Sequence, residues 1–274
     1  MDQQVSRIKP LGVYFTLAYL ISWLIWFPLY SPALGIKSLP VLAFHHGIGG
    51  LGPLIASFIT TWIFEGGEGI NNLFRRMIKV RPLLYVVIAL LSPFLLAFMA
   101  SLINYLVNQH PLALSGLFAA KEFPEFSFAG FLLYNLFFFG WGEEVGWRGF
   151  ALPRLQYTFN ALSSSIILTV FWAIWHLPLF LYRPGFMDMD VAGIFGWVFS
   201  LLTGSVLLTW FYNSSKASIL VCAIFHATVD IVFLADFNDQ NISNYMGMLI
   251  TIWGIATLVI FKPHNLSRTE QNCQ

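Results

Sequence analysis

A series of long apolar runs, separated by short polar segments, most constrains what this chain can fold into. A membrane-spanning helix needs ~20 apolar residues, and eight runs approach that length, at residues 11–30, 41–64, 83–107, 126–144, 162–182, 191–212, 217–236 and 244–261. Only 10% of the 274 residues are charged, whereas a soluble domain carries about 25%. We therefore predict an all-α, polytopic membrane helix bundle of about eight transmembrane helices, with residues 1–274 forming a single integral-membrane domain.

The positions of Lys and Arg predict how the bundle is oriented. If the N-terminus is cytoplasmic, eight spans leave only Lys37, Lys121 and Arg183 on the outer side. Basic residues favour cytoplasmic loops, so we expect both termini in the cytoplasm and a polar C-terminal tail at 262–274. We expect a multi-pass protein of a bacterial cell membrane, surrounded by lipid and without a nucleic-acid partner.

Two cytoplasmic connections contain apolar residues at helical spacing. In the 65–82 connection, basic residues alternate with apolar ones, which is typical of a short helix lying on the inner leaflet. A basic loop that only sets topology explains this segment equally well. The segment 146–160 is similar, with Pro153 interrupting it.

The segment from Trp141 to Phe150, WGEEVGWRGF, carries the most unusual charges. It places two glutamates and an arginine at the end of an apolar run, where ionisable groups are costly and usually functional. On a helix, Glu144 and Arg148 are i,i+4 neighbours in the favourable order. Glu143 points about 100° away from Glu144, so it lacks this counter-ion and is available for chemistry.

Three further polar residues interrupt later apolar runs. His176 lies in FWAIWHLPLF, whereas His226 and Asp230 lie four residues apart in the next-but-one run and share a helix face. Each alone could be a polar group that holds helices together. Together with Glu143 they predict a polar pocket inside the bundle. His45 and His46 could line the same pocket, but we interpret them as structural residues near the outer interface.

This set of residues suits hydrolysis of an amide. A carboxylate can act as general base, and imidazole can hold water, donate to an oxyanion or bind a metal. The chain contains no HExxH or GxSxG motif, and the apolar surroundings of Cys222 favour an inert thiol. Zinc accepts carboxylate and imidazole ligands, so a metal could be held by Glu143, His176, His226 and Asp230.

Three motifs resemble those of one family. EEVGWR is similar to its EExxxR motif, Trp172–His176 to its FxxxH motif, and His226–Asp230 to its HxxxN/D motif. The family is the CPBP group of intramembrane proteases, which joins type II CAAX prenyl endopeptidases with Abi-like bacteriocin-processing and self-immunity proteins. The resemblance covers a catalytic core at about 126–236.

The resemblance implies a role for each residue. Glu143 becomes the general base that polarises water with His176, His226 and Asp230 form the oxyanion side, and Glu144 with Arg148 supports the site. Trp172 replaces the family's Phe, which we interpret as packing. Because ionised Asp only accepts hydrogen bonds, we expect Asp230 to orient His226 or to bind a metal. The family implies either a zinc cofactor or a metal-free glutamate mechanism.

The resulting hypothesis is an intramembrane endopeptidase that cleaves a membrane-anchored or lipid-modified peptide or protein with Glu/His-activated water. We expect its active-site cavity to open toward the cytoplasmic side. A proton-coupled transporter and a non-enzymatic bacteriocin-immunity protein are the alternatives. Glu143 lies near the cytoplasmic end of its predicted span, whereas His176 lies about 21 Å into the next one at ~1.5 Å per residue. We therefore expect the fifth helix to project into the cytoplasm.

Overall fold

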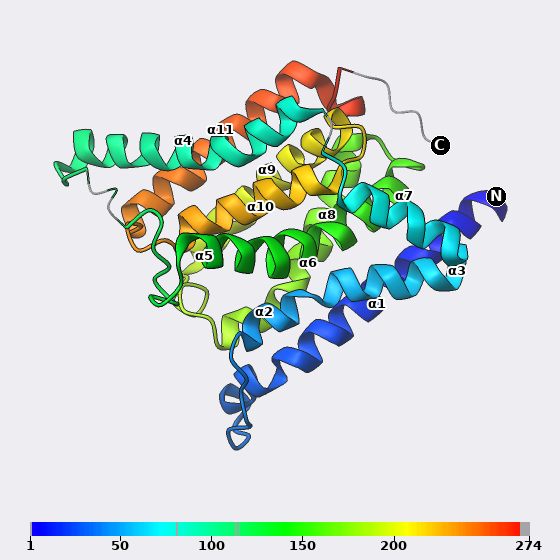
Figure 1. The fold of residues 1–274 in the computed structure, drawn as a ribbon, viewed down its shortest axis with the longest axis horizontal. Coiled ribbons are helices and arrows are strands. Elements are labelled where there is room, and N and C mark those ends of the chain that lie inside the picture. The colour runs from blue at the N-terminus through cyan, green and yellow to red at the C-terminus, as the bar shows by residue number, and fades with distance from the viewer. Residues whose placement is uncertain (1, 81, 113, 115, 269–274) are drawn as a thin grey trace.

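The computed structural model describes residues 2–80, 82–112, 114 and 116–268, and these are predominantly helical (Figure 1). The α-helices are α1 (Asp2–Tyr30), α2 (His45–Gly50), α3 (Gly52–Met77), α4 (Leu83–Asn108), α5 (Phe128–Asn135), α6 (Gly142–Glu144), α7 (Leu152–Gln156), α8 (Ala161–Trp175), α9 (Val191–Ser214), α10 (Ile219–Leu234) and α11 (Gln240–Asn265). Two 3₁₀ segments follow α1 and α8, at Ser31–Leu34 and Leu177–Leu181. Two π-helical segments flank α6, at Leu136–Trp141 and Val145–Ala151.

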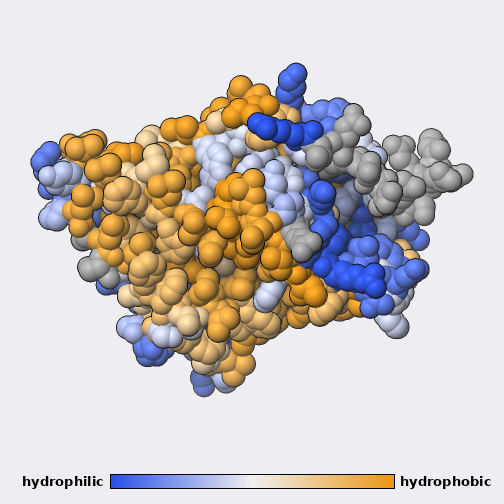
Figure 2. All heavy atoms as spheres, turned by 45° about the horizontal axis from the view of Figure 1, so that its top comes forward, coloured by the Kyte–Doolittle hydropathy of each residue, from blue (hydrophilic) through white to orange (hydrophobic). Residues whose placement is uncertain are grey.

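This architecture confirms the predicted polytopic helical bundle. Among the described residues, six helices are long and apolar enough to cross a membrane, and α10 is a shorter apolar helix. The remaining predicted span, 126–144, is also mostly helical but contains the π-helical segment Leu136–Trp141. Figure 2 shows a broad apolar surface with hydrophilic residues gathered mainly toward one end, as expected of a chain surrounded by lipid.

The helices pack in pairs around one central segment. α1 lies along α3, α9 along α11 and α4 along α10, while the segment from α5 to α7 contacts α3 on one side and α10 on the other. α1 begins and α11 ends on the same side of the bundle (Figure 1), which fits an even number of membrane passes. That this side is cytoplasmic stays a prediction from the basic residues.

The central segment is longer than predicted. Its helix does not end at Glu144 but continues to Gln156, because the side chains from Val145 to Leu152 are all buried against neighbouring helices. Glu143 therefore lies in the middle of a helical segment. His176 can therefore lie at the same depth as Glu143 without the fifth helix projecting into the cytoplasm, contrary to our expectation.

Glycines allow the central segment to pass between its neighbours. A Cβ atom on Gly140 would lie 2.6 Å from the carbonyl oxygen of Ala223 in α10, and one on Gly146 would lie 2.6 Å from the carbonyl oxygen of Pro53 in α3. Both distances are shorter than a carbon–oxygen contact permits. The helices on the two sides can therefore approach Glu143 and Glu144 closely only because these two positions lack side chains.

The 65–82 connection is helical as far as Met77, so it is not only a basic loop. Non-helical backbone at Gly66 separates this helix from the preceding part of α3, in agreement with the predicted short helix, and its place on the inner leaflet stays a prediction. Gly66 has φ 64° and ψ −155°, a conformation that glycine adopts without steric cost. The Arg76 guanidinium donates to the Gly149 carbonyl and the Tyr212 hydroxyl, at 2.9 and 2.8 Å, and so fixes the end of α3 to the central segment and α9.

The start of the predicted tail is ordered. α11 bends at Lys262 (φ 61°), after which Leu266 is fully buried. The side-chain amide of Asn213 donates to the Asn265 carbonyl at 2.7 Å, which attaches this turn to α9. Residues 269–274 of the predicted tail, including Cys273, lie outside the described residues.

Candidate active site

Glu143 lies on α6 with its carboxylate held by one hydrogen bond. Its side chain is 4% exposed, and its Oε2 accepts the indole N–H of Trp172 from α8 at 2.7 Å. Glu143 also lines the large cavity of the bundle. A single donor from a neutral ring leaves the rest of the carboxylate available to water or substrate.

Glu144, its neighbour in the sequence, is engaged on the opposite side. Its Oε1 accepts hydrogen bonds from the Arg148 guanidinium at 2.8 Å and from Nδ1 of His226 at 2.7 Å. Glu144 and Arg148 are both 0% exposed, and Arg148 also donates to the Ser205 hydroxyl on α9 at 3.2 Å. The predicted ion pair is confirmed, and it joins α9 and α10 to the central segment.

His226 and Asp230 share a face of α10, as their spacing predicts. His226 Nε2 lies 3.6 Å from Asp230 Oδ2, which is longer than a hydrogen bond. The closer partner of His226 is Glu144, on Nδ1. Glu144 therefore takes the orienting role that we expected of Asp230. Because a carboxylate can only accept, Nδ1 carries the proton and Nε2 faces Asp230 and the cavity.

His176 follows α8 directly, at the point where the helix tightens into the 3₁₀ turn containing Pro178. Its Nδ1 lies 2.7 Å from the Trp172 carbonyl oxygen, so Nδ1 is the protonated nitrogen and Nε2 carries a lone pair. Trp175, Phe186 and Trp197 surround the ring, with centroid distances of 4.9, 6.1 and 5.6 Å. The imidazole is thereby fixed in tautomer and in orientation.

One cavity of about 1100 Å³ brings together all four residues predicted to be catalytic, namely Glu143, His176, His226 and Asp230. These residues come from the central segment, α8 and α10, as the predicted convergence of three spans requires. Glu144 and Arg148 do not line it among the described residues. The cavity wall thus separates the two adjacent glutamates.

The cavity extends between α9 and α11 toward the N-terminal ends of these helices. A Cβ on Gly254 of α11 would touch Thr203 of α9, at 2.7 Å from its Cβ, so the helices are in close contact there. Farther along, a Cβ on Gly196 would meet nothing within 4 Å, and one on Gly247 would meet only the Ser200 hydroxyl at 3.9 Å. The helices therefore diverge toward the 183–190 connection.

The position of this opening bears on two predictions. The described lining residues include the 183–190 connection and the first turns of α9 and α11, but none from the connections at 65–82, 145–160, 213–218 or 262–268. The described lining of the cavity thus lies toward the end of the bundle opposite the two termini. If the cavity opens at this end, a cytoplasmic opening would require termini on the other side of the membrane.

The arrangement of these side chains does not fit the metal site considered from the sequence. Among the described residues, no group of three or more His, Cys, Asp or Glu side chains is placed to hold a metal ion, whereas catalytic zinc usually has three protein ligands. His226 directs one nitrogen to Glu144 and the other toward Asp230, and His176 uses Nδ1 on a carbonyl. We derive no reaction step through a metal.

Two residues outside the predicted catalytic set also lie on the cavity wall. His46 lines the cavity with its Nδ1 2.8 Å from the Tyr182 hydroxyl, which agrees with the alternative considered for it. The interpretation of His45 as structural agrees with its contacts to the Leu42 amide and the Ile25 carbonyl. Arg183, which the charge distribution assigned only to the outer side, also lines the cavity and donates to both carboxylate oxygens of Glu122. No periodicity in the sequence distinguishes His46 from His45.

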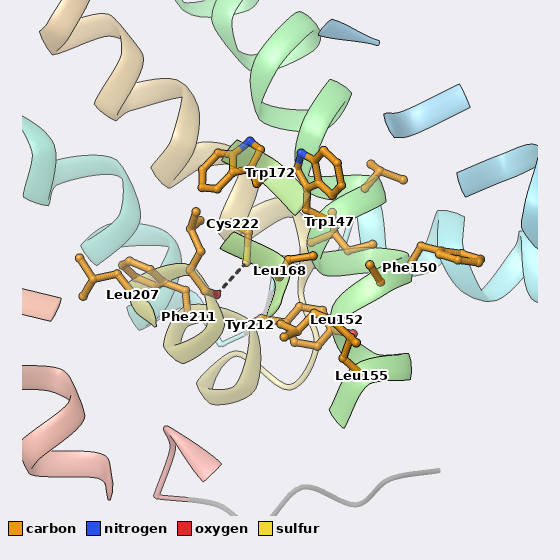
Figure 3. Packing of buried hydrophobic residues seen from close by; sticks show 14 of the residues in the cluster. Trp147, Phe150, Leu152, Leu155, Leu168, Trp172, Leu207, Phe211, Tyr212 and Cys222 are labelled. Atoms are coloured by element: carbon orange, nitrogen blue, oxygen red, sulfur yellow. Dashed lines mark hydrogen bonds between the residues drawn. The ribbon is translucent and has the colours of Figure 1, made fainter. Parts of the chain in front are cut away.

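Trp172 requires a correction, whereas Cys222 does not. We interpreted Trp172 as packing, but its indole N–H donates to Glu143. Figure 3 shows Trp172 at the edge of the buried apolar cluster and Cys222 inside it, where the Cys222 thiol contacts the Leu208 carbonyl at 3.6 Å. Buried among apolar groups, this thiol is not placed to act as a nucleophile.

Comparison with known proteins agrees with this geometry. Residues 125–232 match the family described as type II CAAX prenyl endopeptidase Rce1-like, which includes all four cavity-lining residues predicted to be catalytic. This matched segment is thus similar to CAAX-type endopeptidases. The CAAX prenyl protease 2 of Methanococcus maripaludis is 28% identical over 121 residues, which cover 43% of this chain and 42% of that protein. The chain therefore aligns with less than half of this relative.

Proposed function

We propose that this protein is an intramembrane endopeptidase in which Glu143 and His176 activate water. The observation that carries the proposal is that these two side chains, fixed by Trp172 through its N–H and its carbonyl, face the same cavity. In a water-poor site, a carboxylate with one neutral donor is a suitable general base. The similarity of residues 125–232 to CAAX endopeptidases supports the same reaction class.

The reaction proceeds in two steps. Glu143 takes a proton from a water molecule that also donates to the lone pair of His176 Nε2, and the resulting hydroxide attacks the carbonyl carbon of the scissile peptide bond. In the second step the C–N bond breaks, and the departing amine takes the proton from Glu143. Water is thereby divided between the new carboxylate and the new amine, and Glu143 returns to its starting state.

The oxyanion formed in the first step needs a donor, and His226 is positioned to supply it. Two carboxylates, Glu144 and Asp230, flank this ring, and such a surrounding favours a doubly protonated imidazole. Nε2–H then donates to the oxyanion from the cavity side. Asp230 acts beside His226 by holding its charged form.

We propose a lipid-modified or membrane-anchored substrate. The divergence of α9 and α11 supports this, because it leads from the cavity to helix surfaces where Phe195 is 73% and Met248 47% exposed. In a bilayer these surfaces contact lipid. The archaeal relative is named a CAAX prenyl protease, so a farnesylated peptide with a CAAX-type C-terminus is the first substrate to test.

A comparison of membrane proteomes tests the proposal and identifies the substrate. Membranes from cells that express wild type, Glu143→Gln or the matched control Glu68→Gln, an exposed glutamate on α3, are analysed for new C-termini. We expect the same cleavage products with wild type and Glu68→Gln, and none with Glu143→Gln. Products that persist with Glu143→Gln would refute the proposed function, as would their absence with wild type.

The proposed chemistry uses no metal, and purified protein can show this directly. We expect turnover to survive prolonged incubation with a chelator and to be independent of the zinc content measured by mass spectrometry. If a chelator abolishes turnover and added zinc restores it, the reaction is metal-assisted hydrolysis. That result would contradict metal-free activation of water by Glu143 and His176.

A further inference from the structure

Trp172 contacts four members of the proposed site at once. Its indole N–H donates to Glu143 and its carbonyl accepts from His176, both at 2.7 Å. The Arg148 guanidinium lies over its ring, 4.5 Å from the centroid. The edge of the ring meets His226 at 5.6 Å and 73°. Trp172 therefore links the cavity wall to the buried Glu144–Arg148–His226 network.

The hydrogen bond from Trp172 restricts a side chain that is otherwise flexible. A glutamate has three rotatable side-chain bonds, and the cavity beside Glu143 offers about 1100 Å³ in which its carboxylate could take several orientations. The indole N–H selects Oε2, so that Oε1 is the oxygen left for a water molecule. A general base must be held within hydrogen-bond reach of the proton that it removes.

The indole itself is held rigidly. Trp172 is 6% exposed, and its ring is fixed by the cation–π contact with Arg148 and the edge-on contact with His226. Figure 3 shows Trp172 bordering the apolar cluster, with its ring nitrogen on the side away from Cys222. A donor that cannot rotate orients its acceptor at little additional cost in conformational entropy.

We propose that Trp172 is a positioning residue that sets the orientation of Glu143 for water activation through its indole N–H. The inference rests on the proposed endopeptidase function. It assigns a role to the position at which this chain departs from the FxxxH motif, where phenylalanine would keep an aromatic ring but provide no donor. The contribution to catalysis therefore comes from one N–H group and is separable from packing.

Two substitutions at this position separate the donor from the ring. Trp172→Phe removes the N–H together with part of the ring, whereas replacement of Trp172 by 3-benzothienylalanine exchanges the N–H for sulfur and keeps the bicyclic shape. Loss of a hydrogen bond to a charged group predicts a kcat about 10- to 100-fold lower in both variants. We expect KM within about twofold and little change in the melting temperature for the benzothienyl variant, since the shape of the ring and its packing contacts are retained.

Trp210→Phe is the matched control for removing an indole from a buried position. Trp210 is 7% exposed, and its indole nitrogen has no hydrogen-bond partner among the described residues. It packs against Tyr85 and Trp253, away from the cavity. This variant should lose stability by the same packing effect but keep the wild-type kcat.

The outcomes distinguish this inference from the proposed function on which it rests. A benzothienyl variant with wild-type kcat would overturn the positioning role, even if Glu143→Gln is inactive and the endopeptidase function stands. Activity in Glu143→Gln would remove both. A fall in kcat for Trp172→Phe but not for the benzothienyl variant would assign the effect to ring packing and also overturn the inference.

Discussion

The cavity wall and the buried network behind it use the same residue types in opposite ways. Glu143 on the wall has one neutral hydrogen-bond donor and lines a large cavity. Glu144, one residue later, is fully buried and accepts from Arg148 and His226. The two carboxylates are neighbours in the chain, yet only one of them is accessible to a substrate.

This difference shows how a helix can place reactive and structural charges side by side. Successive residues on a helix point about 100° apart, so a helix between two others presents them to different neighbours. The first carboxylate faces the cavity, while the second is neutralised by a buried ion pair. A buried pair is costly to desolvate but fixes one arrangement of the helices around it. We expect mutations on the wall to affect rate and mutations behind it to affect stability.

The largest effect is expected on the wall, at His176. His176→Ala removes the nitrogen that holds the water, and general acid–base groups contribute about 10²- to 10⁴-fold. We expect cleavage to fall by that factor in purified protein while the melting temperature changes little. His226→Ala is the informative comparison, because its loss should lower both cleavage and stability. Cleavage at the wild-type rate by His176→Ala would contradict the role of His176 in holding the water.

Behind the wall, Glu144→Gln should act mainly on folding. It leaves Arg148 buried without a full counter-charge, which predicts a loss of about 3–5 kcal/mol in the free energy of unfolding. The measurement is reversible unfolding in mixed detergent micelles. The double variant Glu144→Gln/Arg148→Met removes the isolated charge and should recover part of the loss. Unchanged stability in Glu144→Gln would show that the two regions do not differ as described.

Asp230 lies between the two regions, since it lines the cavity and flanks His226. Asp230→Asn keeps the shape of the side chain and removes its charge, so we expect a decrease in kcat of less than about tenfold. Asp230→Ala should cost more, because nothing then contacts Nε2 of His226. The measurement is the kcat of each variant relative to wild type. A kcat equal to the wild-type value in both variants would remove Asp230 from the site.

The smallest effect is expected at a partly exposed ion pair that borders the cavity. Arg183 and Glu122 form a bidentate pair whose side chains are 16% and 43% exposed. Exposed pairs contribute about 0–1 kcal/mol, so Glu122→Gln should change the free energy of unfolding by no more than that. A loss of unfolding free energy as large as that of Glu144→Gln would mean that ion pairing, and not burial, determines how much a carboxylate stabilises the fold.

Much of the fold and the identity of the cavity residues followed from the sequence. Apolar runs of membrane length predicted the helices, and polar residues within them predicted Glu143, His176, His226 and Asp230, because both signals are local. The ion pair of Glu144 and Arg148 followed from i,i+4 spacing. These predictions did not require knowledge of how the helices pack.

The predictions that failed depend on contacts between distant segments. The charges at Glu144 and Arg148 ended the predicted span too early, because hydropathy does not register that they neutralise each other. The bond from Trp172 to Glu143 and the contact of Glu144 with His226 join different helices. The position of His46 on the cavity wall arises from the packing of α2 against α1 and the central segment. Spacing within one helix cannot indicate any of these.

The central claim is that Glu143, facing the cavity, removes the proton from water. The most direct measurement is single-turnover cleavage of the peptide identified in the membrane comparison by purified Glu143→Gln, with the rate normalised to folded protein. We predict a rate at least about 10³-fold below wild type, with unfolding unchanged. Cleavage within tenfold of wild type would contradict the account.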